Sequence, residues 1–260
     1  MGKMVAFITG ATSGIGAAFA RHFAGEGYDL ILTGHPDDSN NLLLDDLKQK
    51  FNVDIRLIFA DLSVENDIAK LEELIKKNDK IEILVNNAGY LDGVPFLKNE
   101  SKKLEQMIMV HINSPMRFVH AVLPNMLLMG RGIIINLSSL AAYTPFPDYA
   151  MYPATKMFNI GFTESLHITL RKKGIKLQVL CPGFVKTNFH KRAGVNLSEF
   201  KNRGLIKWLS PEKVVQISIR NLKKKNKVIV VPGFVNKLIR IMSLIIPRRI
   251  YYKLASQFLN

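Results

Sequence analysis

Seven short apolar segments alternate with segments of helical length along this chain, and that alternation restricts the folds open to it. The apolar segments are 4–8, 28–33, 54–59, 81–85, 132–137, 175–180 and 227–231. The clearest segments of helical length are 64–78, 101–129 and 149–172. Strands that alternate with helices form parallel sheets through right-handed crossovers, with helices on both faces. We therefore predict one α/β domain over residues 1–260, with a doubly wound, parallel, seven-stranded, Rossmann-like sheet.

Composition agrees with one globular domain. The chain has 260 residues, of which 48% are hydrophobic and 22% charged, and one α/β core can reach this length. The single cysteine, Cys181, excludes a disulfide framework and a cysteine-rich zinc site, so we expect a cytoplasmic protein. Met4–Ile8 is too short for a signal-peptide core, and no run approaches the ~20 apolar residues that span a bilayer. We expect no metal site.

The turn after the first apolar segment carries glycines that suit a dinucleotide. Residues 9–16 read TGATSGIG and open a helix-compatible stretch. Gly10 permits a tight turn, Gly14 lets backbone N–H groups approach a pyrophosphate, and Gly16 permits close helix packing. The amino end of the helix adds partial positive charge. The alternative is a tight turn that binds nothing.

Tyr152 and Lys156 lie four residues apart in a helical segment, so their side chains share one face. A free phenol has a pKa of about 10 and keeps its proton at neutral pH. A neighbouring ammonium favours the phenolate, so we expect Lys156 to lower the pKa of Tyr152. The spacing alone occurs by chance in many helices. Tyr143 and Tyr149 have no lysine four residues further on.

These motifs, in this order, resemble the short-chain dehydrogenase/reductase family, in the branch that carries TGxxxGxG and YxxxK. The resemblance covers about residues 4–232. It rests on Thr9 to Gly16, Asp61-Leu62, Asn86 to Gly89, Asn113, Ser139, Tyr152 to Lys156 and Pro182 to Thr187. It implies hydride transfer between a nicotinamide cofactor and a carbonyl or alcohol, in a homo-oligomer, either a dimer or a tetramer.

The resemblance also implies roles for individual residues. Tyr152 would exchange a proton with the substrate oxygen, Ser139 would polarise the carbonyl, and Lys156 would hold the nicotinamide ribose. Asn113 would hold a water that relays protons to Lys156. The residues implied in cofactor binding are Gly10, Thr12, Ser13, Gly14, Ile15, Gly16, His35, Asp61, Leu62, Asn87, Ala88, Gly89, Tyr152, Lys156, Pro182, Gly183, Val185 and Thr187.

The end of the second strand bears on the choice between NAD and NADP. Family members that prefer NAD usually place an acidic residue there, and Gly34 takes that place here. His35 could contact a 2′-phosphate, although neither position 13 nor the end of this strand supplies Arg or Lys. We predict NADP as the cofactor, with NAD as the alternative.

Several of these residues have simpler interpretations. Asn87 could brace the sheet instead of contacting the cofactor, and Asp61 could form an Asx turn before the helix at 64. Ser138 is the immediate rival of Ser139, although neighbouring strand residues point in opposite directions. Pro115 predicts a bend at about 111–113 in the helix 101–129. The histidines on predicted helices, His22, His111, His120 and His167, are interpreted as packing or surface residues.

The excess positive charge lies entirely in the last 75 residues. Residues 1–185 hold 19 basic and 19 acidic residues, whereas residues 186–260 hold 17 and 2. We predict a substrate lid at 188–210, whose cations, Lys191, Arg192, Lys201, Arg203 and Lys207, could bind coenzyme A or an acidic acyl carrier. A solvated basic surface is the alternative. Without a recognition motif, nucleic acid is not expected.

The basic and apolar extension at 234–260 contains Leu238 to Ile246, followed by Pro247-Arg248-Arg249. We expect it to pack against the core or another subunit, with peripheral contact to anionic lipid as the second interpretation. Function is predicted as an NAD(P)-dependent oxidoreductase, with a lipophilic or acyl substrate as one hypothesis. The alternative is a non-catalytic nucleotide-binding redox sensor or interaction protein.

Overall fold

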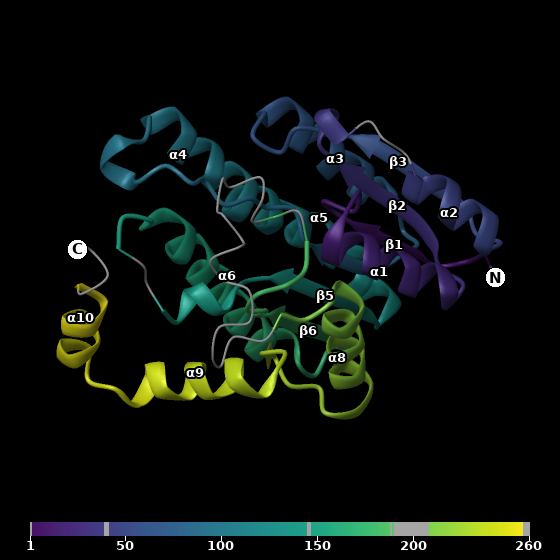
Figure 1. Ribbon diagram of the computed structural model, residues 1–260. Coiled ribbons are helices and arrows are strands. Elements are labelled where there is room, and N and C mark those ends of the chain that lie inside the picture. The colour runs from purple at the N-terminus through teal and green to yellow at the C-terminus, as the bar shows by residue number, and fades with distance from the viewer. Residues whose placement is uncertain (1, 39–41, 145–146, 188, 190–207, 257–260) are drawn as a thin grey trace.

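The computed structural model describes residues 2–38, 42–144, 147–187, 189 and 208–256, which form a parallel sheet between two helical layers (Figure 1). The strand order is β3-β2-β1-β4-β5-β6-β7, and each neighbouring pair is parallel. The strands are β1 (Val5–Ile8), β2 (Asp29–Gly34), β3 (Ile55–Phe59), β4 (Ile81–Asn86), β5 (Gly132–Leu137), β6 (Ile175–Leu180) and β7 (Ile229–Val230). The prediction of a doubly wound seven-stranded sheet is confirmed.

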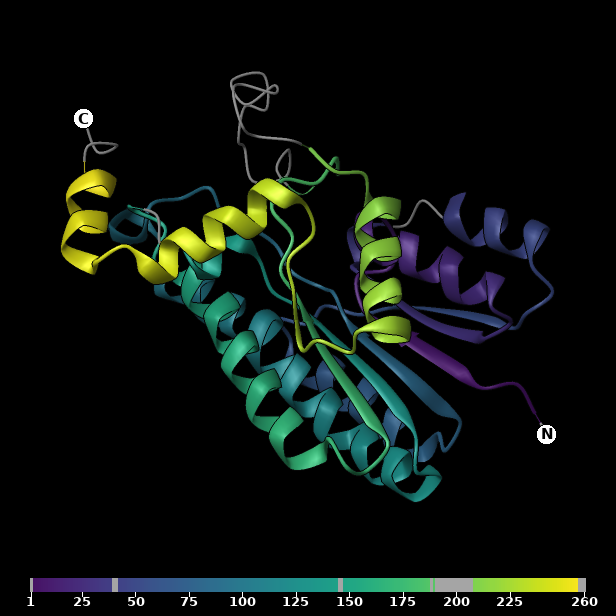
Figure 2. The same cartoon turned by 90° about the horizontal axis from the view of Figure 1, so that it is seen from below.

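The helices divide between the two faces of the sheet (Figure 2). One face is covered by α1 (Gly14–Gly25), α2 (Leu42–Lys50) and α8 (Pro211–Lys224). The other is covered by α3 (Glu65–Lys77), α5 (Ser114–Met129) and α6 (Met151–Leu170), with α4 (Ser101–Ile108) preceding α5. The C-terminal segment adds α9 (Phe234–Ile245) and α10 (Arg248–Ser256).

Strand β1 shows how a continuous apolar segment serves both layers. Successive side chains of a strand point to opposite faces. Ala6 and Ile8 accordingly belong to the core beneath α1, whereas Val5 and Phe7 belong to the core beneath α5. The ring of Phe7 meets that of Phe118 edge-on, with 6.0 Å between the centroids. An apolar side chain is therefore needed at every position of this strand.

The helical segment predicted at 101–129 is divided by a π-helical turn, Met109–Asn113. Pro115 has no N–H, so it cannot bond the carbonyl of residue 111, four positions earlier. The freed carbonyl of His111 accepts a hydrogen bond of 3.0 Å from Nδ2 of Asn159 on α6. The irregular turn predicted from Pro115 thus ties the α4–α5 unit to the helix that carries Tyr152 and Lys156.

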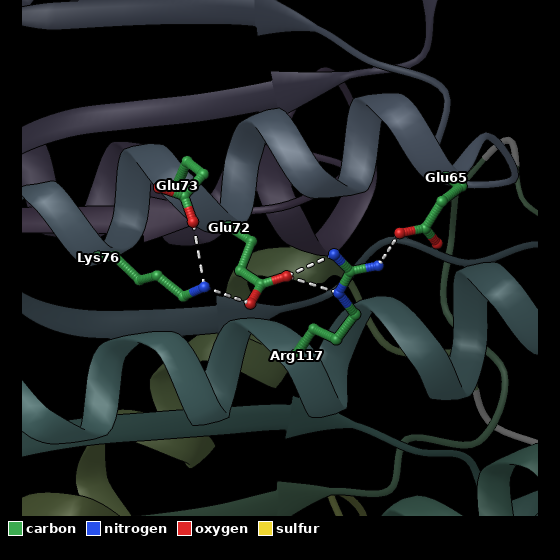
Figure 3. Close-up of polar contacts among 5 residues, drawn as sticks. All are labelled: Glu65, Glu72, Glu73, Lys76 and Arg117. Atoms are coloured by element: carbon green, nitrogen blue, oxygen red, sulfur yellow. Dashed lines mark hydrogen bonds and ion pairs between the residues drawn. The ribbon is translucent and has the colours of Figure 1, made fainter.

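An ion-pair network fixes α5 against α3 (Figure 3). Arg117 on α5 binds Glu65 and Glu72 on α3, with 2.5 Å between its Nη2 and Oε2 of Glu72. Nζ of Lys76 lies 2.8 Å from Glu72 and 3.1 Å from Glu73. Such partly exposed pairs stabilise little, typically below about 1 kcal/mol each, but they define the register of the two helices.

Helix α9 lies at the carboxyl edge of the sheet, where Asn236 packs against Gly183, just after β6. The expected packing into the core is seen at Ile239, which lies against the cluster of Val179 and Val231. It is wrong for Leu238, Ile241 and Ile245, which are about half exposed or more. Among the described residues, no helix is both long and apolar enough to cross a membrane.

Candidate active site

The glycine turn forms a tight connection between β1 and α1. Gly10 and Gly14 have φ values of +60° and +58°, which L side chains rarely adopt. At Gly16 a Cβ would lie 2.3 Å from the carbonyl oxygen of Gly10. The first turn of α1 carries no acidic residue, so the partial positive charge of its amino end is not neutralised there. This backbone suits the pyrophosphate of a dinucleotide.

Asn87 braces this turn from the end of β4. Its Nδ2 donates hydrogen bonds of 2.9 Å to the carbonyls of Thr9 and Gly10. The backbone N–H groups of Asn87 and Ala88 both donate to Oγ1 of Thr9, at 3.0 Å. The side-chain amide of Asn87 therefore braces the glycine turn. Contact of Asn87 with the cofactor stays a prediction.

The end of β2 meets the same turn. A Cβ at Gly34 would lie 2.3 Å from Cγ2 of Thr12, so only glycine fits there. Oγ1 of Thr12 donates a 2.6 Å hydrogen bond to Asp38. Nε2 of His35 lies 3.8 Å from Asp61, which also accepts from the N–H of Ser63 in the Asx turn considered above. Thr12, His35 and Asp61, which the resemblance implies in cofactor binding, thus lie together at the end of β2.

The loop after β6 reaches the turn from the other side. A Cβ at Gly14 would lie 3.0 Å from Cγ2 of Thr187. The carbonyl of Pro182 accepts from the N–H of Leu140, and Val185 pairs with Leu209 in a parallel bridge. Most of the predicted lid, residues 188 and 190–207, lies outside the described residues. The five cations predicted to bind an acidic carrier lie there too: Lys191, Arg192, Lys201, Arg203 and Lys207.

Tyr152 and Lys156 lie on one face of α6, next to the end of β5. Nζ of Lys156 lies 5.6 Å from the centroid of the Tyr152 ring and donates to the carbonyl of Leu137 at 3.2 Å. The hydroxyl of Ser139 acts on Tyr152 so as to lower its pKa, and it accepts a hydrogen bond from the N–H of Ala141. The triad predicted from sequence is therefore assembled.

The two serines have different surroundings. Ser138 is buried, and its Oγ donates a 2.7 Å hydrogen bond to the carbonyl of Lys156. This bond fixes the carboxyl end of β5 to the turn of α6 that carries Tyr152 and Lys156. Of the two serines, Ser139 is the one that affects the pKa of Tyr152. The sequence preference for Ser139 over its neighbour agrees with this geometry.

Burial shifts the pKa values of both Tyr152 and Lys156 in the protein alone. It raises the pKa of Tyr152 to about 12, although the hydrogen bond from Ser139 acts in the opposite direction. Burial also lowers the pKa of Lys156 to about 8. The lowering expected from Lys156 together with a bound nicotinamide is not seen in the protein alone, where loss of solvation dominates the pKa of Tyr152. At neutral pH the phenol holds a proton that it can donate.

Sequence reasoning assigned His111 to packing and missed its place beside this pair. Its Nε2 accepts a 3.0 Å hydrogen bond from the N–H of Tyr90, and its Nδ1 lies 3.0 Å from Oγ1 of Thr155. Because Nε2 accepts, Nδ1 carries the proton and the ring is neutral. Burial, followed by the charge of Lys156, holds the pKa of His111 well below 6.5.

His111 also closes the space around the reacting groups. Its ring centroid lies 5.8 Å from that of Tyr152. A Cβ at Gly89 would lie 3.1 Å from Nε2 of His111 and 3.3 Å from Nζ of Lys156. The helix break predicted at Pro115 was the sequence signal for this residue, since side chains of such a turn face the helix packed against it.

Asn113 lies in the same π turn as His111. Its Oδ1 is buried and has no hydrogen-bond partner among the described residues. An unsatisfied buried carbonyl oxygen is suited to accept from a water. The relay role of Asn113 stays a prediction.

An apolar hollow opens beside Tyr152 between the segments 92–107 and 148–152. Its apolar lining includes Val94, Phe96, Leu104 and Met107. The N–H of Phe96 donates to the carbonyl of Asp148 at 2.6 Å, which joins the two segments.

Comparison with known proteins identifies the family. The model of the short chain dehydrogenase family matches residues 4–197. This chain belongs to that family. It is accordingly an NAD(P)-dependent oxidoreductase acting on a CH–OH or C=O group, as the sequence predicted.

Three curated relatives and one solved structure give the range of similarity. A very-long-chain 3-oxoacyl-CoA reductase of Mus musculus is 31% identical over 97% of this chain and 78% of its own length. The chain covers 61% of the form in Rattus norvegicus. A 3-oxoacyl-(acyl-carrier-protein) reductase of Buchnera aphidicola is 33% identical over 72% of this chain and 75% of its own. A short-chain dehydrogenase from Sphingobium yanoikuyae, in complex with NADPH, is 27% identical, with a TM-score of 0.81 over 89% of this chain and 88% of its own.

Proposed function

We propose that this protein reduces 3-oxoacyl thioesters to 3-hydroxyacyl thioesters. The observation that carries the proposal is the arrangement of Tyr152, Lys156 and Ser139, in which burial keeps the phenol of Tyr152 protonated at neutral pH and able to donate. The substrate class is supported by the names of the Mus and Buchnera relatives.

The reaction transfers a hydride and a proton to the ketone. The nicotinamide, when bound, supplies the hydride to the carbonyl carbon. Ser139 orients the carbonyl oxygen by a hydrogen bond, and Tyr152 donates its proton to that oxygen. Lys156 supplies a positive charge next to the phenolate that this transfer leaves. The products are the alcohol and the oxidised cofactor.

We propose that the glycine turn at Gly10, Gly14 and Gly16 holds the pyrophosphate, and that Lys156 holds the nicotinamide ribose. Thr187 lies over the turn, and Gly89 lies beside Lys156. NADP is the proposed cofactor, because Gly34 provides no carboxylate at the end of β2 and the Sphingobium relative binds NADPH. The hydrogen bond of Thr12 to Asp38 favours NAD as the alternative, since a carboxylate repels a 2′-phosphate.

A steady-state assay of both cofactors with a set of ketones, aldehydes and 3-oxoacyl thioesters tests these proposals. We expect the highest kcat/KM with a 3-oxoacyl thioester and NADPH. A coenzyme A thioester and a neutral thioester with the same acyl chain are then compared. A difference in kcat/KM between them reports recognition of the acidic carrier by the basic residues 186–260 and not recognition of the acyl chain. A preference for small polar aldehydes would contradict the substrate class, and a marked preference for NADH would contradict the cofactor.

We propose that this protein assembles through exposed apolar side chains on its outer helices. Exposed apolar side chains on α5 and α6, including Leu128, Met157 and Ile168, would pair in a homo-oligomer. Sedimentation equilibrium tests this, and a monomer at micromolar concentration would contradict it. We also propose a cytoplasmic site of action, because the single cysteine, Cys181, is buried and has no disulfide.

A further inference from the structure

Helix α9 directs its apolar side chains away from the protein. Phe234, Leu238, Ile241 and Ile245 recur at spacings of three and four residues, which places them in one stripe along the helix. Their exposed fractions are 82%, 46%, 49% and 69%. Met242 adjoins the stripe and is 45% exposed. Such a stripe would face the core in an ordinary surface helix.

The opposite side of α9 attaches it to the protein through polar residues and through Ile239, which packs against the core cluster of Val179 and Val231. Asn236 and Ser243 are at most 9% exposed. Asn236 packs so closely against Gly183 that a Cβ there would lie 2.7 Å from its Oδ1. The guanidinium of Arg240 lies over the ring of Tyr143, 5.2 Å from its centroid. The described residues thus leave the stripe of Phe234, Leu238, Ile241 and Ile245 uncovered, while the opposite side of α9 contacts the protein.

The charge around this face restricts the partner. Residues 234–256 contain five cations and no acidic residue. The cations are Lys237, Arg240, Arg248, Arg249 and Lys253. Ile250 and Tyr252 on α10 are also exposed, at 53% and 61%. An exposed apolar stripe accompanied by cations and aromatic rings is the composition of helices that lie in the interface of an anionic bilayer.

We propose that α9 and α10 dock this protein on an anionic membrane surface. The stripe from Phe234 to Ile245 enters the boundary between headgroups and acyl chains, and the flanking cations contact lipid phosphates. A second copy of this chain is a poorer partner, because a two-fold contact would place five cations against five, with no acidic residue in this segment.

Docking in this way brings the lipid phase close to the active site. Arg240 of α9 contacts Tyr143, which follows Ser139 by four residues. The docking itself does not depend on which carbonyl compound is reduced.

Co-sedimentation of the full chain with vesicles tests the proposal. The probes are vesicles of phosphatidylcholine alone and vesicles that also contain phosphatidylglycerol, each at low and high salt. We expect binding to the anionic vesicles at low salt, and weaker binding to the neutral vesicles or at high salt. Ile245→Glu should lower the partition coefficient about tenfold or more, because it replaces apolar area with a charge.

Val64→Glu is the control, because Val64, just before α3, is also an exposed aliphatic residue, at 44%, and lies outside α9 and outside the surface proposed for the oligomer. It should bind the vesicles like the wild type. Absence of wild-type binding at low salt, or equal loss in both variants, would overturn the proposal. Loss of a dimer in Ile245→Glu without vesicle binding by the wild type would assign α9 to a second copy. Ketone reduction measured without vesicles reports separately on the proposed function.

Discussion

The first 185 residues and the last 75 use the same apolar side chains in opposite ways. In the first region, charges balance and the apolar residues of strands and helices face the sheet core, as Phe7 and Phe118 do. In the second, charge is strongly positive and the apolar stripe of α9 faces outward. Hydrophobic periodicity predicts a helix and its stripe in both regions. It does not say whether the stripe faces the core or a partner.

The largest expected difference between the two regions concerns stability. Phe118 is fully buried, whereas Ile241 is 49% exposed. Phe118→Ala should lower the free energy of unfolding by about 3–5 kcal/mol, because it leaves a cavity. Ile241→Ala should change it by less than about 0.5 kcal/mol. Urea denaturation of both variants measures the two values. Equal losses would mean that α9 packs into the core after all.

A second prediction concerns the pH dependence of reduction. The pKa of Lys156 is about 8, so its ammonium is charged below that pH and neutral above it. Because the charge stabilises the phenolate left by proton donation, kcat should fall above pH 8, approaching tenfold per pH unit. Pre-steady-state measurement of cofactor oxidation between neutral and alkaline pH tests this. A rate that stays flat up to pH 10 would contradict the role of Lys156.

A third, smaller effect should come from His111, whose pKa in the folded protein lies well below 6.5. The unfolded chain binds this proton more readily, so its contribution to stability is present above pH 6.5 and is lost as pH falls below it. The loss reaches up to about 1.4 kcal/mol per pH unit. His111→Asn should flatten this part of the stability profile.

The same variant separates positioning of Tyr152 from general stability. With Thr155 and Tyr90 no longer joined through the imidazole, kcat should fall while the Kd of the cofactor stays near the wild-type value. Denaturation at several pH values and cofactor titration provide the two readouts. An unchanged kcat with an unchanged pH profile would mean that His111 only fills space.

Much of the fold and site could be predicted because they depend on local patterns. The strands are continuous apolar segments, the turn at Gly10 and Gly14 needs positive φ, and Tyr152 with Lys156 needs only helical spacing. The role of His111 could not be predicted, because it depends on Thr155 and Tyr90, 44 and 21 residues away in sequence. The raised pKa of Tyr152 depends on burial, which no spacing reveals.

The central claim is that Tyr152 donates the proton while hydride reaches the carbonyl carbon. Its most direct test is single-turnover oxidation of NADPH by Tyr152→Phe in the presence of a 3-oxoacyl thioester, beside a direct titration of NADPH. Tyr28→Phe is the control, since Tyr28 packs against the core beneath α1 and does not line the hollow beside Tyr152. We predict that Tyr152→Phe lowers the rate by about 10²–10⁴-fold with cofactor affinity unchanged, and that the control retains its activity. A rate for Tyr152→Phe close to that of the wild type would contradict the claim.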